Sequence, residues 1–196
     1  MAEQEKINVL IVEDDPDFCF LIKDCLKKEN DMTVCGTASS PAQALILAQA
    51  MGPDIVLMDL NLTASNLDGI QAAKMIRIST DAKVLILTAF ENPQIITDAC
   101  RRSFASGYIF KSQFSLLLET IRKTAGGHTP QEHLIASLIL SELSPAEYSI
   151  FELLMGKDLK LQSSPKTIAN QKNNLLKKLG LANQSELIHI FKGLTY

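Results

Sequence analysis

The sequence lacks several features that mark large classes of protein. No apolar run approaches the ~18 residues that a membrane-spanning helix needs, and the polar start, Met-Ala-Glu-Gln-Glu-Lys, is unlike a secretory signal. The four cysteines form no CxxC pair and the three histidines are scattered, which argues against a zinc site and a disulfide framework. We therefore expect a cytoplasmic protein with no membrane partner.

The chain is long enough for two ordinary domains, and its charge is unevenly distributed. Of its 196 residues 46% are hydrophobic, which suffices for packed cores. Acidic residues outnumber basic ones in residues 1–124, whereas the two kinds are nearly balanced in residues 125–196. A turn-forming cluster, Gly126–Pro130, lies where the balance changes. We expect one domain over residues 1–124, a partly helical linker over 125–140 and a second domain over 141–196.

Strand-like and helix-like segments alternate through the first part. Five runs are rich in Val, Ile and Leu and apolar at successive positions, which is typical of strands buried on both faces: Ile7–Val12, Met32–Ala38, Asp54–Met58, Lys83–Thr88 and Gly107–Phe110. Between them, helical periodicity places Phe18, Leu21, Ile22, Cys25 and Leu26 on one face of a helix over Phe18–Lys28. Further helices are expected from Ser40 and Pro41 onward and over Gly69–Ile78, Pro93–Arg102 and Ser112–Thr124. The alternation predicts an α/β fold with a doubly wound, five-stranded parallel sheet.

Polar side chains lie at the carboxyl ends of four expected strands, the edge at which such sheets bind ligands. They are Glu13 and Asp14 after the first strand, Asp59 after the third, Thr88 at the end of the fourth and Lys111 after the fifth. Crowded carboxylates repel one another unless a cation offsets their charge, and oxygen ligands suit Mg²⁺. Taken alone, an acid such as Asp15 is explained equally well by a helix-capping role. A lone lysine is explained equally well as a solvated surface charge. Their conjunction at one edge favours a functional site.

Four segments, in order, resemble the motifs of the receiver domain of a two-component response regulator. They are Val9–Asp15, Ile55–Asn61, Leu85–Ala89 and Ser106–Lys111. The resemblance covers residues 6–124 and implies a flavodoxin-like receiver. It also implies that Asp59 accepts a phosphoryl group from a sensor histidine kinase, which forms an acyl phosphate.

The same resemblance implies a Mg²⁺ site around the phosphoacceptor. Asp14 and Asp59 would supply side-chain oxygens, Asn61 its backbone carbonyl and Glu13 a contact through water. A stand-alone enzyme on this sheet is weakly supported, because no glycine-rich phosphate loop follows the first strand. Phosphatases that use an aspartyl phosphate would also want a second acid where this chain has Asn61. We therefore expect phosphotransfer and self-dephosphorylation only.

The resemblance further implies a switch. Lys111 would pair with the phosphoryl group, Thr88 would hydrogen-bond it and move toward it, and Tyr108 would swing into the space left behind. One departure lies after the acceptor: Thr63 stands where family members usually place a proline, and the loop to the Asp68–Gly69 pair is longer. This change bears on loop flexibility and on phosphate lifetime.

Residues 131–196 show no convincing strand, so we expect this part to be all-helical. Ser144, Pro145 and Glu147 form a capping box that opens a helix over about Pro145–Met155. Ser164 and Pro165 open another helix that runs to about Leu179, where Gly180 ends it. A last amphipathic helix covers about Gln184–Lys192.

Three segments of this second part resemble a LuxR-type helix-turn-helix: Leu143–Pro145, Ser164–Ile168 and Leu175–Leu181. Together with the receiver, they resemble the NarL/FixJ subfamily of transcriptional response regulators. The helix from Pro165 would then be the recognition helix. Its phosphate contacts would be Lys166, Thr167 and Lys178, and its base contacts Ala169, Asn170 and Asn173. Without the resemblance, these lysines are better read as the solvated face of an amphipathic helix.

The helix-turn-helix is shorter than the family pattern. Between the first helix and Ser164 the chain is about six residues short, with room for at most one turn of the scaffold helix, which needs ~3.6 residues a turn. Ala169 and Gln171 replace a usual basic residue and a usual histidine. We expect a DNA-binding transcriptional regulator that is controlled by phosphorylation and active as a homodimer. The alternative is a phospho-switched dimerisation or protein-interaction regulator whose degenerate helix-turn-helix does not bind DNA.

Overall fold

The computed structural model describes residues 6–62, 68–160 and 163–194. Five parallel strands form one sheet in the order β2-β1-β3-β4-β5. The strands are β1 (Ile7–Val12), β2 (Met32–Ala38), β3 (Ile55–Met58), β4 (Lys83–Thr88) and β5 (Gly107–Phe110). This order reverses direction beside β1, so the carboxyl ends of β1 and β3 flank the crevice in which such sheets bind ligands. The expected doubly wound parallel sheet is confirmed.

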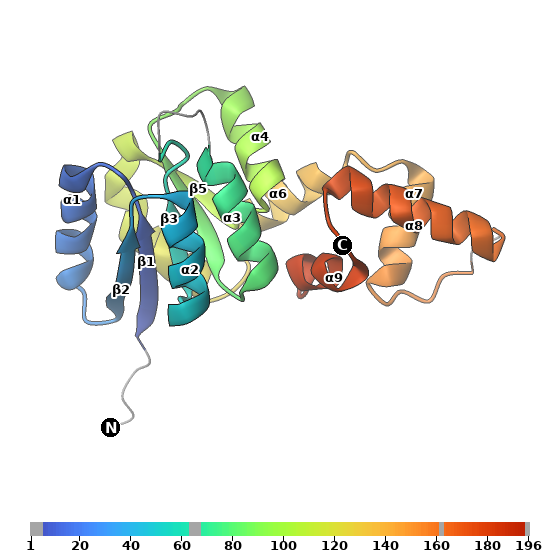
Figure 1. The fold of residues 1–196 in the computed structure, drawn as a ribbon, viewed down its shortest axis with the longest axis horizontal. Helices are drawn as coiled ribbons and strands as arrows, with labels where there is room; N and C mark the ends of the chain where they lie inside the picture. The colour runs from blue at the N-terminus through green and yellow to red at the C-terminus, as the bar shows by residue number, and fades with distance from the viewer. Residues whose placement is uncertain (1–5, 63–67, 161–162, 195–196) are drawn as a thin grey trace. The chain divides into compact units, whose positions relative to one another are not determined.

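Helices cover both faces of the sheet (Figure 1). They are α1 (Pro16–Lys27), α2 (Pro41–Met51), α3 (Asp68–Ser79), α4 (Pro93–Ser103) and α5 (Leu117–Ala125). Side chains of α1 and α5 share one core with the sheet, as Ile22 and Ile121 illustrate. Side chains of α2 and α3 share the other core, where Ala48 and Ile76 are buried. Because both faces are covered, successive strand residues are buried, which explains the unbroken apolar runs.

Short polar residues and prolines set where the helices begin. The side chain of Asp15 accepts hydrogen bonds from the first-turn N–H groups of α1, and Ser40 and Asn92 do the same for α2 and α4. A proline follows each cap at the first helical position. Asp15 is therefore a helix cap, which is the simpler of the two explanations for an acid at that position.

Two local expectations are wrong. Leu21, placed on the buried face of α1, is 45% exposed, whereas Cys19 is buried instead. The helix expected over Ser112–Thr124 begins as a 3₁₀ helix, η1 (Lys111–Leu116), and only then becomes α5. Gln113 breaks the helical dihedral pattern inside η1, and no side chain caps its start. Short 3₁₀ segments of this kind are frequent at the ends of α-helices.

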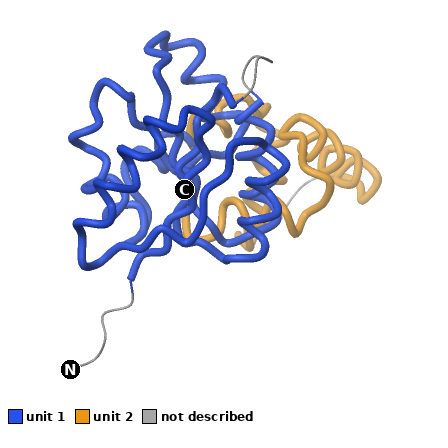
Figure 2. Tube along the Cα trace, turned by 60° about the vertical axis from the view of Figure 1, so that its left-hand side comes forward, with its two compact units in different colours: residues 1–135 blue, residues 136–196 orange. Residues whose placement is uncertain are grey.

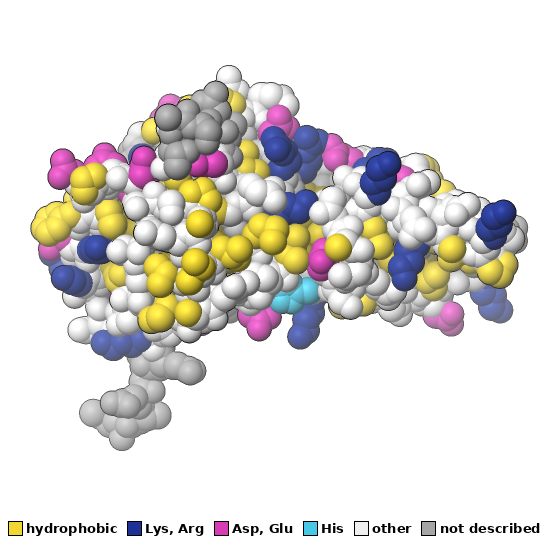
Figure 3. All heavy atoms as spheres, viewed as in Figure 1, with side chains coloured by type: hydrophobic (Ala, Val, Ile, Leu, Met, Phe, Trp, Pro, Cys, Tyr) yellow, Lys and Arg dark blue, Asp and Glu magenta, His cyan; other side chains and the backbone are white. Residues whose placement is uncertain are grey.

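Helix α2 carries no charged residue, and part of its apolar surface is open. Ile46 and Met51 on α2 and Met75 on α3 are exposed. Figure 3 shows apolar side chains gathered over these two helices. In the part of the chain described, no helix is long and apolar enough to cross a membrane.

The chain divides into two compact units, residues 1–135 and 136–196 (Figure 2). The dividing point falls inside α6 (Pro130–Leu140), whose first part belongs to the first unit. The second unit continues with α7 (Pro145–Leu154), α8 (Pro165–Leu179) and α9 (Gln184–Phe191). Its described residues contain no strand. The all-helical expectation is confirmed for that described part.

The second unit has its own small core. Phe151 of α7 and Phe191 of α9 pack edge to face with ring centroids 5.1 Å apart. Leu175 and Leu179 of α8 are also buried. The expected capping box is present, because Ser144 accepts from the N–H of Glu147 while Glu147 accepts from the N–H of Ser144. Between α7 and α8, residues 155–160 and 163–164 form no helix.

Candidate functional site

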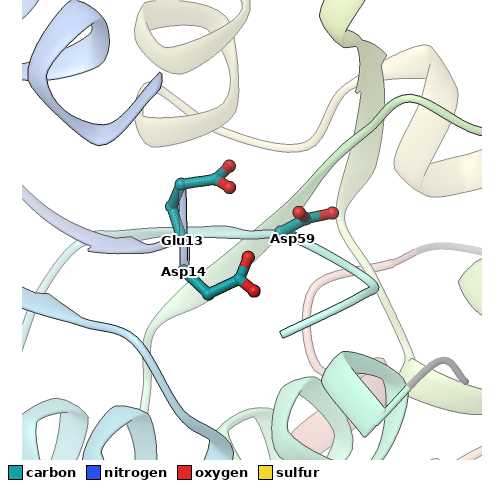
Figure 4. A group of neighbouring side chains, drawn as sticks. All are labelled: Glu13, Asp14 and Asp59. Carbon is teal, nitrogen blue, oxygen red and sulfur yellow. The ribbon is translucent and has the colours of Figure 1, made fainter. Parts of the chain in front are cut away.

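Three carboxylates meet at the carboxyl ends of β1 and β3. Glu13 and Asp14 follow β1 and Asp59 follows β3, and one carboxylate oxygen of each lies within 4.8 Å of the others. Figure 4 shows the three side chains as close neighbours at the strand ends. Glu13 and Asp59 are buried and Asp14 is exposed. The sheet thus creates a compact negative site that is open on the side of Asp14.

Lys111 supplies the opposing charge from the end of β5. Its Nζ lies 2.7 Å from Oε2 of Glu13 and 2.9 Å from Oδ2 of Asp59. The same Nζ lies 4.5 Å from the centroid of the Phe18 ring, on α1. One ammonium group is therefore fixed by two buried acids and an aromatic face.

The electrostatics of the site follow from this crowding. Burial is the main reason that the pKa of Glu13 is raised above its ordinary value of 4.5; the charge of Asp59 adds to the rise and the hydrogen bond from Lys111 opposes it. Burial alone would lower the pKa of Lys111, but its hydrogen bonds and charge interactions with Glu13 and Asp59 outweigh that effect and raise it. The lysine is therefore charged at neutral pH, and it offsets part of the repulsion between Glu13 and Asp59.

The loop after Asp59 is held against the start of α3. The N–H of Gly69 donates to the carbonyl of Leu60 at 3.1 Å, and the N–H of Leu62 donates to Oδ1 of Asp68 at 3.0 Å. A Cβ at position 69 would lie 2.0 Å from the carbonyl oxygen of Asp59. Glycine is required here because the helix start touches the backbone of the candidate phosphoacceptor. Thr63, the departure noted in the sequence, lies outside the described residues.

Thr88 and Tyr108, the two expected switch residues, lie on adjacent strands. Thr88 is fully buried, and its Oγ1 accepts a hydrogen bond from the N–H of Phe90 at 3.1 Å. Tyr108 is half-buried, and its ring lies edge to face with that of Phe110 at 5.5 Å. The hydroxyl of Thr88 is thus hydrogen-bonded within the turn that follows β4. The ring of Tyr108 contacts that of Phe110 but is not fully buried.

The donor set fits a hard divalent cation. Carboxylate oxygens are the ligands that Mg²⁺ prefers, and a partly open site leaves room for the waters that it keeps. The three acids follow the ends of two paired strands, which cannot move apart without disturbing the sheet. Asn61 is exposed beside them, and its N–H makes a long, 3.4 Å contact with Oδ1 of Asp59.

The exposed face of α8 carries the other predicted site residues. Lys166, Thr167, Ala169, Asn170 and Asn173 are all exposed. The helix begins at the cap residue Ser164, whose Oγ also lies 2.9 Å from Oγ1 of Thr167. On the face seen in Figure 3, the basic side chains of the second unit are spread out rather than gathered in one patch.

Lys178, the remaining predicted phosphate contact, is tied to its own unit. Its Nζ lies 2.8 Å from Oε2 of Glu147 and donates to the carbonyl of Glu142 at 2.9 Å. The pKa of Glu147 is lowered, mainly by the hydrogen bond from Lys178. The hydrogen bond from the backbone N–H of Ser144 lowers it further. The side chain therefore fastens the end of α8 to the start of α7.

Sequence reasoning missed three residues at these sites. Helical periodicity placed Phe18 in the core but gave no sign that its ring lies over Lys111. Gly69 was noticed as half of a pair with Asp68, without its contact to the backbone of Asp59. Gln131, described further below, lies in a linker with no pattern that marks it.

Comparisons with known proteins identify the family. Residues 9–122 match the model of the response regulator receiver domain. The chain is 24% identical to the nitrate/nitrite response regulator protein NarL of Escherichia coli (strain K12), over 95% of each chain. It is 28% identical to the transcriptional regulatory protein MctR of Rhizobium johnstonii (strain DSM 114642 / LMG 32736 / 3841), over 96% of this chain and 94% of that one.

A solved structure agrees. The crystal structure of a two-component response regulator of the LuxR family from Aurantimonas sp. SI85-9A1 superimposes with a TM-score of 0.59. The two are 27% identical, and the match covers 70% of this chain and 98% of that one. The chain belongs to the response regulator receiver family and, over nearly its whole length, is a response regulator of the NarL and LuxR type.

Proposed function

We propose that this protein is a phosphorylation-controlled, DNA-binding regulator of transcription that receives its phosphoryl group on Asp59 from a sensor histidine kinase. The proposal rests on one observation: Glu13, Asp14 and Asp59 form an acidic cluster, and the ammonium group of Lys111 contacts two of its members, Glu13 and Asp59. This arrangement combines a nucleophilic carboxylate, a cation site and a fixed positive charge, which are the parts that phosphoryl transfer to an aspartate needs.

The chemical step follows from these positions. A carboxylate oxygen of Asp59 attacks the phosphorus of a phosphohistidine; the P–O bond forms, the P–N bond breaks and the imidazole of the kinase leaves. Mg²⁺, held by Asp14 and Asp59 with the carbonyl of Asn61 and a water on Glu13, would offset charge on the phosphoryl oxygens. Lys111 then exchanges its bond to the carboxylate of Asp59 for one to the phosphoryl group.

The response to phosphorylation uses Thr88 and Tyr108. The Oγ1 of Thr88 would leave the N–H of Phe90 and turn to a phosphoryl oxygen, and Tyr108 would occupy the space released. Beyond phosphotransfer and self-dephosphorylation on its own aspartate, the chain would turn over no substrate. We assign residues 1–124 to the receiver, 125–140 to the linker and 141–196 to the output domain.

The output would be a homodimer that reads a two-fold DNA site through α8. Lys166, Thr167 and Lys178 would contact phosphates, and Ala169, Asn170 and Asn173 would face the bases. Support comes from the exposed position of all six of these side chains and from the name of the relative MctR, a transcriptional regulatory protein. Because Lys178 is already paired with Glu147, we expect it to contribute less to phosphate binding than Lys166.

The test is selection of DNA from a random pool by the full chain, phosphorylated with acetyl phosphate and Mg²⁺. Asp59→Asn, which keeps the shape but removes the nucleophile, is the matched control. Enrichment of a two-fold sequence by the wild type alone would support both the phosphoacceptor and the DNA-binding role. A mass shift of one phosphoryl group without enrichment would overturn DNA binding, and absence of the mass shift would overturn the assignment of Asp59.

A further inference from the structure

The first turn of α6 makes a specific contact with the strand that carries the candidate switch tyrosine. The side-chain Oε1 of Gln131 accepts a hydrogen bond of 3.1 Å from the backbone N–H of Tyr108. β5 is the edge strand of the sheet and pairs only with β4. The glutamine therefore satisfies a backbone donor that no neighbouring strand reaches, at a strand edge that would otherwise be open.

Gln131 fills a space that glycine leaves. A Cβ at Gly107 would lie 2.5 Å from Oε1 of Gln131 and 3.0 Å from a methyl group of Leu85. The side-chain amide thus lies directly against the backbone of β5, with no slack between the two. A small displacement of β5 at this point must either break the hydrogen bond or move the glutamine.

The adjacent residue anchors the same turn. The carboxylate of Glu132 is almost fully buried, with Oε2 2.8 Å from Nδ1 of His128 and 3.3 Å from Nζ of Lys83. Its Oε1 lies 3.9 Å from the guanidinium of Arg77, which in turn donates to the carbonyls of Phe104 and Ala82. A buried carboxylate among three basic side chains anchors the first turn of α6, and Gln131 lies directly beside this anchor.

We propose that Gln131 links the state of the phosphorylation site to α6, because its hydrogen bond to Tyr108 favours the unphosphorylated position of β5. This inference rests on the proposed function, in which the Tyr108 side chain moves when Asp59 is phosphorylated, and it adds that the backbone of β5 shifts with that side chain. α6 is the helix in which the first unit ends, and its last residues, from Ala136 onward, belong to the second unit. A change at Gln131 therefore acts on the helix that leads to the output residues.

Thermodynamic linkage makes the inference measurable. If the Gln131 bond stabilises the unphosphorylated state, phosphorylation must weaken the bond, and loss of the bond must equally favour the phosphorylated state. One neutral hydrogen bond then predicts a two- to tenfold lower half-saturating concentration of a phosphoryl mimic when the acceptor is removed. If the hydrogen bond is equally strong in the unphosphorylated and phosphorylated states, removing the acceptor leaves the half-saturating concentration unchanged.

The experiment titrates the full chain with beryllium fluoride and Mg²⁺, followed by NMR at the amide of Tyr108. In the wild type, hydrogen exchange at this amide is expected to be slow in the free protein and faster in the saturated one. Gln131→Met keeps the length of the side chain but removes the acceptor, so exchange is expected to be fast in both states and half-saturation two- to tenfold lower. Gln71→Met, an exposed glutamine on α3, is the matched control and leaves both values unchanged.

The outcomes separate the two proposals. Equal protection of the Tyr108 amide with and without the mimic in the wild type, which requires no variant to fold, overturns the role of Gln131. Equal half-saturation in wild type and Gln131→Met overturns it as well, while saturation that depends on Asp59 leaves the phosphoacceptor assignment standing. If the wild type does not respond to the mimic at all, the assignment of Asp59 and the inference built on it both fail.

Discussion

The ammonium group of Lys111 lies 4.5 Å from the centroid of the Phe18 ring while it bonds to the carboxylates of Glu13 and Asp59. The two carboxylates balance the charge of the ammonium group, and the Phe18 ring restricts the positions that the group can adopt. Phe18 itself lies edge to face with Phe114 at 5.6 Å. α1 and η1 thus jointly position the side chain that meets the incoming phosphoryl group.

Phe18→Leu is expected to slow phosphorylation of Asp59 by acetyl phosphate about two- to fivefold. The reason is loss of a cation–π contact worth about 0.5–1 kcal/mol, which leaves Lys111 less well placed. The initial rate, measured by mass spectrometry well below the unfolding temperature, checks this. Phe114→Leu disturbs the same aromatic pair without touching Lys111, and Phe20→Leu changes a ring that is 70% exposed. Equal slowing in Phe114→Leu would reduce the role of Phe18 to packing.

Mg²⁺ is expected to raise the unfolding temperature of the wild type, because it binds only where the folded chain brings Asp14 and Asp59 together. At ten times its dissociation constant the gain in unfolding free energy is about 1.4 kcal/mol. Asp14→Asn is expected to be at least as stable as the wild type without metal, since it relieves repulsion in the acidic cluster, and to lose most of the Mg²⁺ effect. Thermal unfolding with and without Mg²⁺ measures both.

Asp17→Asn serves as the control for that experiment, because Asp17 is exposed in the first turn of α1 and outside the cluster. It is expected to keep the full Mg²⁺ effect. A wild type whose unfolding temperature does not respond to Mg²⁺ would contradict the metal assignment.

Gly69→Ala is expected to destabilise the receiver by about 1–3 kcal/mol. In a free helix the same change would stabilise by about 0.5–1 kcal/mol. The clash is expected to dominate because the new Cβ would lie 2.0 Å from the carbonyl oxygen of Asp59, whose backbone N–H is held by a 2.9 Å hydrogen bond to the carbonyl of Val12 in β1. Urea unfolding measures the difference. Gly126→Ala, where the nearest atom would be 3.3 Å away, is expected to change stability by less than about 1 kcal/mol, and similar losses in both variants would refute the contact.

The sequence predicted the sheet and the converging acids because both depend on local patterns. Apolar runs fix which strands are buried on both faces, and the residues after such strands must lie at one edge, so Asp14 and Asp59 were found without coordinates. The contacts of Phe18 and Gln131 could not be found this way. Periodicity places a side chain on a face of its helix, but its partner depends on how distant segments pack. The start of η1 was missed for a related reason: no capping residue marks it.

The ion pair between Glu147 and Lys178 in the second unit can be tested through the pH dependence of stability. The pKa of Glu147 is lowered, mainly by its hydrogen bond from Lys178, so the charged carboxylate stabilises the fold above its ordinary pKa of 4.5. This stabilisation is lost as the pH falls through the lowered value. Glu147→Gln is therefore expected to be less stable than the wild type by about 0.5–1 kcal/mol at pH 7. The difference is expected to shrink below pH 4.5, measured by urea unfolding followed by far-UV circular dichroism.

Lys178→Gln completes the cycle and separates the pair from DNA binding. Lys178→Gln is expected to lose as much stability at pH 7 as Glu147→Gln does. The double variant is expected to lose little more, because each single substitution already removes the same interaction. On DNA, Lys178→Gln is expected to weaken binding less than Lys166→Gln, since the Lys166 side chain is exposed while Lys178 bonds to Glu147. Additive losses in the double variant would mean that the pair does not fasten α8 to α7. A larger DNA effect from Lys178 would mean that it leaves Glu147 to bind phosphate.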